Sequence, residues 1–250
     1  MVAKNNKSLG QHWLKNREIL EEIADSSALE IAEKCVEIGP GLGTLTSSLL
    51  KRFDKVIAVE FDTRLAENLP KSFPGKNLEV INADFLKFDL DSIEGSYVVA
   101  GNIPYYITSP IIEKILTTKN LPKRVVLLIQ KEVAERIADE KESMLSLFVK
   151  NRADVELGVY VPREEFTPPP KVDSQVIILT PHEPKYDDEL FKIIRLAFSA
   201  PRKKLLHNLL PLKSKEELVK IFEKTGVSVD ARPADLHLDD YSRLFAEIVL

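Results

Sequence analysis

The sequence has a single cysteine, Cys35, among its 250 residues. One thiol cannot form a disulfide within the chain, and sparing use of cysteine is typical of proteins that fold in a reducing compartment. Because Cys35 stands in an apolar segment, we interpret it as a small core residue rather than a nucleophile.

Long apolar runs are also missing, since none approaches the ~20 residues that a membrane-spanning helix needs. The first residues intersperse lysine with asparagine and serine, and they lack the apolar core of a signal peptide. We therefore expect a cytoplasmic protein that does not insert into a membrane.

Patterns of metal ligands and activated nucleophiles are absent as well. The four histidines are scattered without the spacing of a metal site: His12, His182, His207 and His237. No serine or cysteine has an evident base partner. The sequence predicts neither a bound metal nor a covalent intermediate on the protein.

An excess of positive charge is the last absence. The formal net charge is −4 and the pI is about 5.7, whereas domains that bind nucleic acid are usually basic. Two local basic clusters nevertheless occur: Lys4, Lys7, Lys15 and Arg17 in the first, and Arg202, Lys203 and Lys204 in the second. We expect them to form a basic rim on an acidic body; the alternative is an ordinary solvated surface.

A glycine-rich turn is the first positive signal. An apolar segment at 35–38 leads into Gly39-Pro40-Gly41-Leu42-Gly43, and a helical pattern follows at 44–52. This order begins a Rossmann-like unit, although a tight turn without a ligand uses the same glycines. Dinucleotide turns have glycine at the first, third and sixth positions, whereas here it occupies the first, third and fifth. Glu37 precedes the turn, and an acid there suits a cation such as S-adenosylmethionine better than a diphosphate.

Polar side chains stand at the ends of the following strands. Glu60, Asp84 and Asn102 each come after a separate apolar segment. Open α/β sheets bind ligands at the carboxyl edge, so we expect these side chains to line one site. There Glu60 can accept from ribose hydroxyls and Asp84 from an adenine amine.

The tetrapeptide at 102–105, Asn-Ile-Pro-Tyr, suits alkylation of the exocyclic amine of adenine. That amine is a poor nucleophile, and oxygens that accept its hydrogen bonds favour the positive charge developing at nitrogen. Asn102 and the Ile103 carbonyl are such acceptors, while Pro104 removes a donor and stiffens the turn. Tyr105 offers a flat face to a base that has left its stack. The alternative is a plain turn at the end of a strand.

Strands and helices alternate along the chain, which predicts an α/β, Rossmann-like sheet of seven strands with helices on both faces. Strands at 155–161 and 172–179 are expected to close it as an antiparallel pair. Beyond a linker, further helical patterns predict a small C-terminal helical domain. We therefore expect a catalytic domain at 1–181 and a helical domain at 182–250. The predicted helices are 16–24, 44–52, 63–69, 109–116, 131–139, 187–197, 203–210, 214–225 and 238–249.

In this order the motifs resemble those of the RNA adenine N6,N6-dimethyltransferases, the family of the bacterial small-subunit rRNA dimethyladenosine transferase and its archaeal and eukaryotic relatives. The resemblance runs almost from end to end. It lies in residues 10–14, 36–43, 101–105, 130–133, 161–162, 166–174 and 202–204.

The resemblance implies a seven-stranded S-adenosylmethionine-dependent methyltransferase fold and assigns roles within it. The implied cofactor contacts are His12, Leu14, Gly39, Glu60, Asp84 and Asn102, to which the turn itself adds Glu37 and Gly41. Asn102 and the Ile103 carbonyl hold the target amine, with Tyr105 and Phe166 flanking the ring. From the charge clusters we expect Arg202, Lys203 and Lys204, in the helical domain, to contact RNA. Since a sulfonium is a good leaving group, alignment and electrostatics suffice for direct methyl transfer, with the amine proton lost to water afterward.

The stretch Phe166-Thr167-Pro168-Pro169-Pro170 has two interpretations. By composition it is a stiff polyproline connector. Beside the predicted pocket, we prefer a rigid loop that holds Phe166 over its mouth.

Three functions compete. The first is dimethylation of two adjacent adenosines near the 3′ end of 16S, small-subunit rRNA, on the subunit or its assembly intermediate, by a monomer. The second is a 23S rRNA adenine methyltransferase of the macrolide-resistance type. The third is a ribosome-assembly factor without catalysis, which the intact motifs disfavour. Two departures from the family pattern, at 143–146 and at Pro201, fall where RNA contacts are expected.

Overall fold

The computed structural model describes residues 11–249, and the chain divides into two compact units. The first holds the chain up to Glu135 together with Asp154–His182, and the second holds Arg136–Ala153 together with the chain from Glu183 onward. The predicted boundary between residues 181 and 182 lies beside one of these crossings. Residues 136–153, which the prediction counted with the first domain, belong to the second unit.

A seven-stranded sheet forms the centre of the first unit. Its strands are β2 (Lys34–Ile38), β3 (Lys55–Glu60), β4 (Leu78–Asn82), β5 (Tyr97–Asn102), β6 (Val125–Gln130), β7 (Ala153–Val161) and β9 (Ser174–Pro181). They lie in the order β4-β3-β2-β5-β6-β9-β7, with parallel pairing from β4 to β6 and β9 antiparallel to β6. The predicted seven-stranded α/β sheet is thus confirmed, and β7 and β9 are neighbours at one end.

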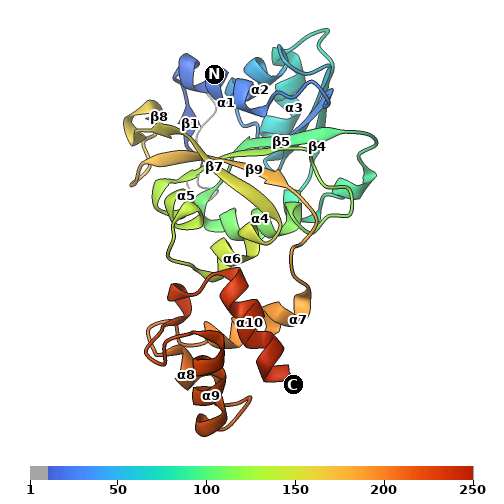
Figure 1. The fold of residues 1–250 in the computed structure, drawn as a ribbon. Coiled ribbons are helices and arrows are strands. Elements are labelled where there is room, and N and C mark those ends of the chain that lie inside the picture. The colour runs from blue at the N-terminus through green and yellow to red at the C-terminus, as the bar shows by residue number, and fades with distance from the viewer. Residues whose placement is uncertain (1–10, 250) are drawn as a thin grey trace. The chain divides into compact units, whose positions relative to one another are not determined.

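Helices cover this sheet on both faces. The helices in this part of the chain are α1 (Arg17–Ser27), α2 (Thr44–Leu49), α3 (Thr63–Ser72), α4 (Thr108–Ile115) and α5 (Lys131–Ala138). Apolar side chains of α1 and α2 share one core cluster with alternate residues of β5 and β6, namely Val98, Ala100, Val126 and Leu128. The helix α4 lies on the opposite face (Figure 1). Because β5 and β6 are buried on both faces, they read as continuous apolar runs.

A separate two-residue ladder joins distant parts of the chain. Strand β1 (Trp13–Leu14) pairs antiparallel with β8 (Phe166–Thr167), so that Leu14 lies opposite Phe166. The Lys15 N–H donates to the Glu165 carbonyl at 3.2 Å and extends this contact. The proline-rich loop therefore holds the segment that contains His12.

The second unit, as far as residue 249, contains the end of α5 and the α-helices α6 (Met144–Lys150), α7 (Asp188–Ala197), α8 (Leu205–Leu209), α9 (Lys215–Thr225) and α10 (Leu238–Val249). They enclose an apolar core that includes Phe191, Phe222 and Tyr241. The four C-terminal helices were predicted and are confirmed. Helix α6 was not predicted; its Leu147 belongs to the same core.

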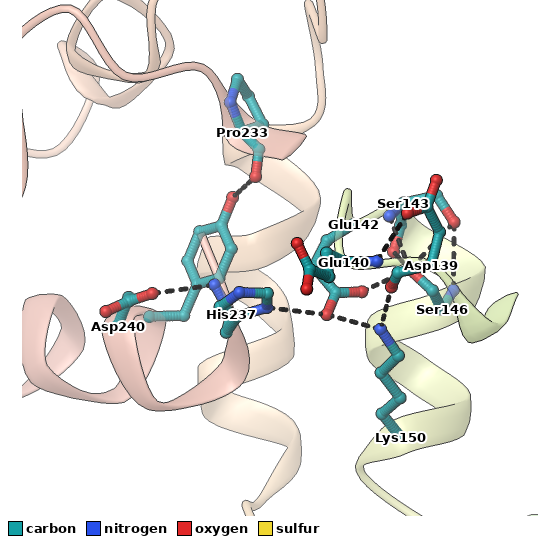
Figure 2. A network of polar contacts seen from close by, with 10 residues as sticks. Asp139, Glu140, Glu142, Ser143, Ser146, Lys150, Pro233, His237 and Asp240 are labelled. Atoms are coloured by element: carbon teal, nitrogen blue, oxygen red, sulfur yellow. Dashed lines mark hydrogen bonds and ion pairs between the residues drawn. The ribbon is translucent and has the colours of Figure 1, made fainter. Parts of the chain in front are cut away.

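A buried carboxylate ties α6 to the C-terminal helices within this unit (Figure 2). Glu142 accepts from the Ser146 hydroxyl at 2.6 Å, forms an ion pair with Lys150 at 2.8 Å and contacts the His237 ring at 3.1 Å. Ser143 caps the helix by accepting from the Ser146 N–H. Ser143, where relatives often have glycine, is thus the N-cap of α6, and Ser146 is fully buried.

Candidate active site

A pocket of about 300 Å³ opens at the carboxyl ends of the parallel strands. Nearly every predicted cofactor and catalytic residue lines it: His12, Leu14, Glu37, Gly39, Gly41, Glu60, Asp84, Asn102, Ile103, Pro104 and Tyr105. These residues come from four strand ends and from the N-terminal segment. The fold thus brings together side chains that are up to 93 positions apart, as His12 and Tyr105 are.

The glycine turn closes one side of the pocket in left-handed backbone conformations. Gly43 has φ +80°, and a Cβ there would stand 2.7 Å from Leu69 Cδ1, so only glycine fits. Gly39 has φ +61° with open space around its missing Cβ. The backbone amides of the turn bond internally: Gly39 N–H donates to the Val59 carbonyl and Gly41 N–H to Glu60 Oε2. These amides are therefore not pointed outward as a cradle for a diphosphate.

Two of the three acids that line the pocket, Glu37 and Glu60, are buried. Glu37 is 1% exposed, and within residues 11–249 its carboxyl group accepts from the Thr46 hydroxyl at 2.6 Å. Burial is the main reason that the pKa of Glu37 is raised to about 8. Repulsion from Glu60 raises this pKa further, whereas the hydrogen bond from Thr46 lowers it. Burial also raises the pKa of Glu60, although the Asp62 and Gly41 amides donate to it. Within residues 11–249 neither carboxyl group forms an ion pair, so a cationic ligand in the pocket would favour their ionised forms.

Asn102 has a fixed side-chain orientation at the end of β5. Its Nδ2 donates to the His12 carbonyl at 2.9 Å. Because the amide nitrogen is committed to that contact, Oδ1 is the group left to accept a hydrogen bond from a ligand. Gly101 permits the close packing beneath it, since a Cβ there would lie 2.9 Å from the Ile38 carbonyl oxygen.

The ring of Tyr105 is held in place beside this corner. Its hydroxyl and that of Ser174 hydrogen-bond at 2.7 Å, and the ring is nearly parallel to that of His12, with 6.3 Å between centroids. The His12 Nδ1 in turn lies 2.8 Å from the Pro168 carbonyl oxygen. Sequence reasoning gave no role to Ser174 or to Thr46; the family motif at 166–174 was the signal for the first, and nothing local marked the second.

Phe166 is the predicted site residue that the structure does not bring to the pocket. It is 2% exposed and packs in the apolar cluster with Leu14 and Leu20. Its place opposite Leu14 in the β1–β8 ladder turns the ring into the core instead of over the mouth. The expected position was wrong because sequence pattern does not tell which face of a two-residue strand is buried.

Among the described residues, the basic ones predicted to bind RNA do not line the pocket. Arg202, Lys203 and Lys204 are exposed in the second unit, and Lys204 forms an ion pair with Asp230. Lys4, Lys7 and Gly10 of the predicted motifs lie outside the described residues. That the basic residues of both clusters bind RNA stays a prediction.

Two further features concern only the described part of the chain. No group of His, Cys, Asp and Glu side chains there has the arrangement of a metal site. None of its helices has the length and apolar character to cross a membrane.

Comparison with known proteins gives consistent matches. Residues 2–249 match the family described as "Ribosomal RNA adenine dimethylase". "Ribosomal RNA small subunit methyltransferase A" of Mycoplasmopsis pulmonis is 39% identical over 249 residues, covering 97% of this chain and 98% of the relative. The protein of that name from Nostoc sp. is 37% identical over 264 residues, covering 97% of each.

Two solved structures resemble the fold over almost its full length. A dimethyladenosine transferase from Plasmodium falciparum has a TM-score of 0.81 and 31% identity, covering 95% of this chain and 98% of that one. The 23S rRNA methyltransferase ErmE has a TM-score of 0.79 and 28% identity, covering 95% of this chain and 100% of that one.

Proposed function

Because the chain belongs to the ribosomal RNA adenine dimethylase family and has its α/β methyltransferase fold, we propose that it dimethylates the N6 amines of two adjacent adenosines near the 3′ end of small-subunit rRNA. We further propose S-adenosylmethionine as the methyl donor. The observation that carries the proposal is the fixed Asn102 amide, whose Oδ1 is left to accept from a ligand at the edge of an acidic pocket.

The pocket residues fit this cofactor. The internally bonded glycine amides and the unpaired acids disfavour a diphosphate and favour a ligand with cationic groups. Glu60 keeps lone pairs for ribose hydroxyls, since each of its oxygens accepts one backbone N–H. Asp84 lines the same pocket and can accept from an adenine amine.

The chemistry required of the protein is modest. S-adenosylmethionine supplies a methyl group on a good leaving group when bound. Asn102 Oδ1 and the Ile103 carbonyl accept the two N–H bonds of the target amine, which favours positive charge on that nitrogen. Tyr105 stacks on the target ring, and its bond to Ser174 keeps that face in position. No general base is needed, because the product ammonium loses its proton readily to water.

The second unit is proposed to contact RNA through Arg202, Lys203 and Lys204, which are exposed. Three cations on one short segment suit the phosphate backbone rather than particular bases. Phe166 is not assigned to the target ring; we propose that it supports Leu14 beneath the cofactor side of the pocket.

The direct test is methyl transfer from labelled S-adenosylmethionine to unmethylated small and large ribosomal subunits, with the product nucleoside identified by mass. The proposal predicts N6,N6-dimethyladenosine in the small subunit alone. Label in the large subunit would instead support the 23S alternative. The observation that favours this alternative is the structural likeness to ErmE. Absence of label from both would support an assembly factor without catalysis.

A further inference from the structure

Two consecutive tyrosines at the pocket have opposite environments. The Tyr105 hydroxyl is bonded to Ser174, whereas Tyr106 is 66% exposed although it lines the same pocket. Within residues 11–249 the Tyr106 hydroxyl makes no hydrogen bond. Each of the other tyrosines has a partner for its hydroxyl: Tyr97, Tyr105, Tyr160, Tyr186 and Tyr241. No hydrogen bond to the described residues therefore accounts for a tyrosine at 106, and most of its side chain is exposed.

The turn that carries Tyr106 is well anchored. Tyr105–Ile107 forms a single 3-10 turn, in which Ile107 N–H donates to the Pro104 carbonyl at 3.2 Å. The Thr108 hydroxyl donates to the Tyr105 carbonyl at 3.1 Å, and Thr108 is itself buried. The exposed ring thus stands on backbone whose position is fixed before any ligand arrives, which lowers the entropy lost on contact.

We propose that Tyr106 is a stacking platform for the nucleotide next to the adenosine in the pocket. The inference rests on the proposed function, in which one base leaves its stack and enters the site. Its neighbour in the strand then loses a stacking partner, and a flat exposed ring at the rim replaces it. Because every base has a π-face, the same ring serves whichever nucleotide adjoins the target.

The test compares Tyr106→Phe, Tyr106→Leu and Tyr106→Ala as full-length proteins on unmethylated small subunits. We expect Tyr106→Phe to keep the KM for RNA within about twofold, and the leucine and alanine variants to raise it by about tenfold. Leucine keeps apolar bulk without a π-face, so the phenylalanine–leucine difference isolates stacking. The dissociation constant for S-adenosylmethionine should be unchanged in all three.

Ile31→Ala is the matched control, because Ile31 is also 66% exposed but does not line the pocket. Its KM should equal that of the wild type. A wild-type KM for Tyr106→Leu, a raised KM for Tyr106→Phe, or weakened cofactor binding across the series would each overturn the stacking role. Wild-type protein that leaves small subunits unmethylated would instead refute the proposed function, and the inference with it.

Discussion

Two buried acids, Glu142 and Glu37, one in each unit, differ in the partners that surround them. Glu142 in the second unit has a side chain 2% exposed and is surrounded by the Lys150 ammonium, the His237 ring and the Ser146 hydroxyl. Glu37 in the first unit is 1% exposed; within residues 11–249 it accepts from the Thr46 hydroxyl and forms no ion pair, and Glu60 repels its charge. An isolated buried charge is unfavourable, and a nearby cation offsets part of that penalty.

The difference indicates a structural role for Glu142 and a ligand-binding role for the acids of the pocket. The second unit compensates its acid with its own side chains, so Glu142 connects helices and needs nothing from outside. Among residues 11–249 no cation pairs with Glu37 or Glu60, and this is the arrangement expected where a charged ligand completes the electrostatics. Substitutions of Glu142 and of Glu37 each act on one side of this contrast.

The largest effect is expected from Asn102→Ala, which alters the pocket but neither acid. Losing the acceptor for the target amine should lower methyl transfer by about 10²- to 10³-fold. The rate is measured with saturating cofactor on small subunits. The same variant should keep its thermal midpoint and bind cofactor measurably. Turnover within fivefold of wild type would remove Asn102 from the chemistry.

Glu142→Ala should remove the hydrogen-bond and ion-pair network around the buried acid of the second unit. Lys150 and His237 lose their shared acceptor, and we expect a loss of about 2–3 kcal/mol in the free energy of unfolding. Urea titration measures it. Glu142→Gln is the control and should lose less, because its side-chain oxygen still accepts from Ser146. Equal stability of Glu142→Ala and wild type would show that the network is incidental.

Glu37→Gln tests the pocket acid that has no counter-charge among the described residues, through the pH dependence of the free energy of unfolding. The folded pKa of about 8 exceeds the ordinary value of 4.5, so the folded state holds the proton more tightly. That contribution to stability is full below pH 4.5 and is lost as pH rises toward 8. Relative to wild type, the glutamine variant should therefore gain of the order of 1–3 kcal/mol in unfolding free energy across this window. A difference in unfolding free energy that does not change with pH would contradict the assignment of Glu37 as a buried acid without a counter-charge in residues 11–249.

The smallest effect concerns the second unit's exposed cations. Changing Arg202, Lys203 and Lys204 to Glu should weaken RNA binding by about tenfold and flatten its dependence on salt, because fewer counterions are released. Binding is measured across a salt series. Glutamate at Lys215, Lys220 and Lys224, a matched charge change on α9, should have less effect. Equal losses in the two triple variants would assign the effect to net charge alone.

The sheet and the pocket were predictable because local signals determine them. Apolar runs marked β5 and β6, and the polar residue at each strand end marked one edge of a parallel sheet. Family resemblance added His12 and Leu14, which no local pattern would have placed beside Asn102.

What could not be predicted depends on pairing between distant segments. The β1–β8 ladder joins residues about 150 positions apart with two residues on each side, too short for any periodicity. It decides that the Phe166 ring is buried. Helix α6 is only seven residues long, and its capping serines were interpreted as possible RNA contacts. Its membership in the second unit follows from side-chain packing of Leu147 and Glu142, which sequence order does not show.

The central claim is that the acidic pocket at the strand ends holds S-adenosylmethionine against the Asn102 corner. A crystal structure of the protein grown with that cofactor tests this most directly. The account predicts electron density between the glycine turn, Glu60 and Asp84, with the methyl group facing Asn102 and Tyr105. Cofactor bound elsewhere, or bound here with its methyl group turned away from Asn102, would contradict it.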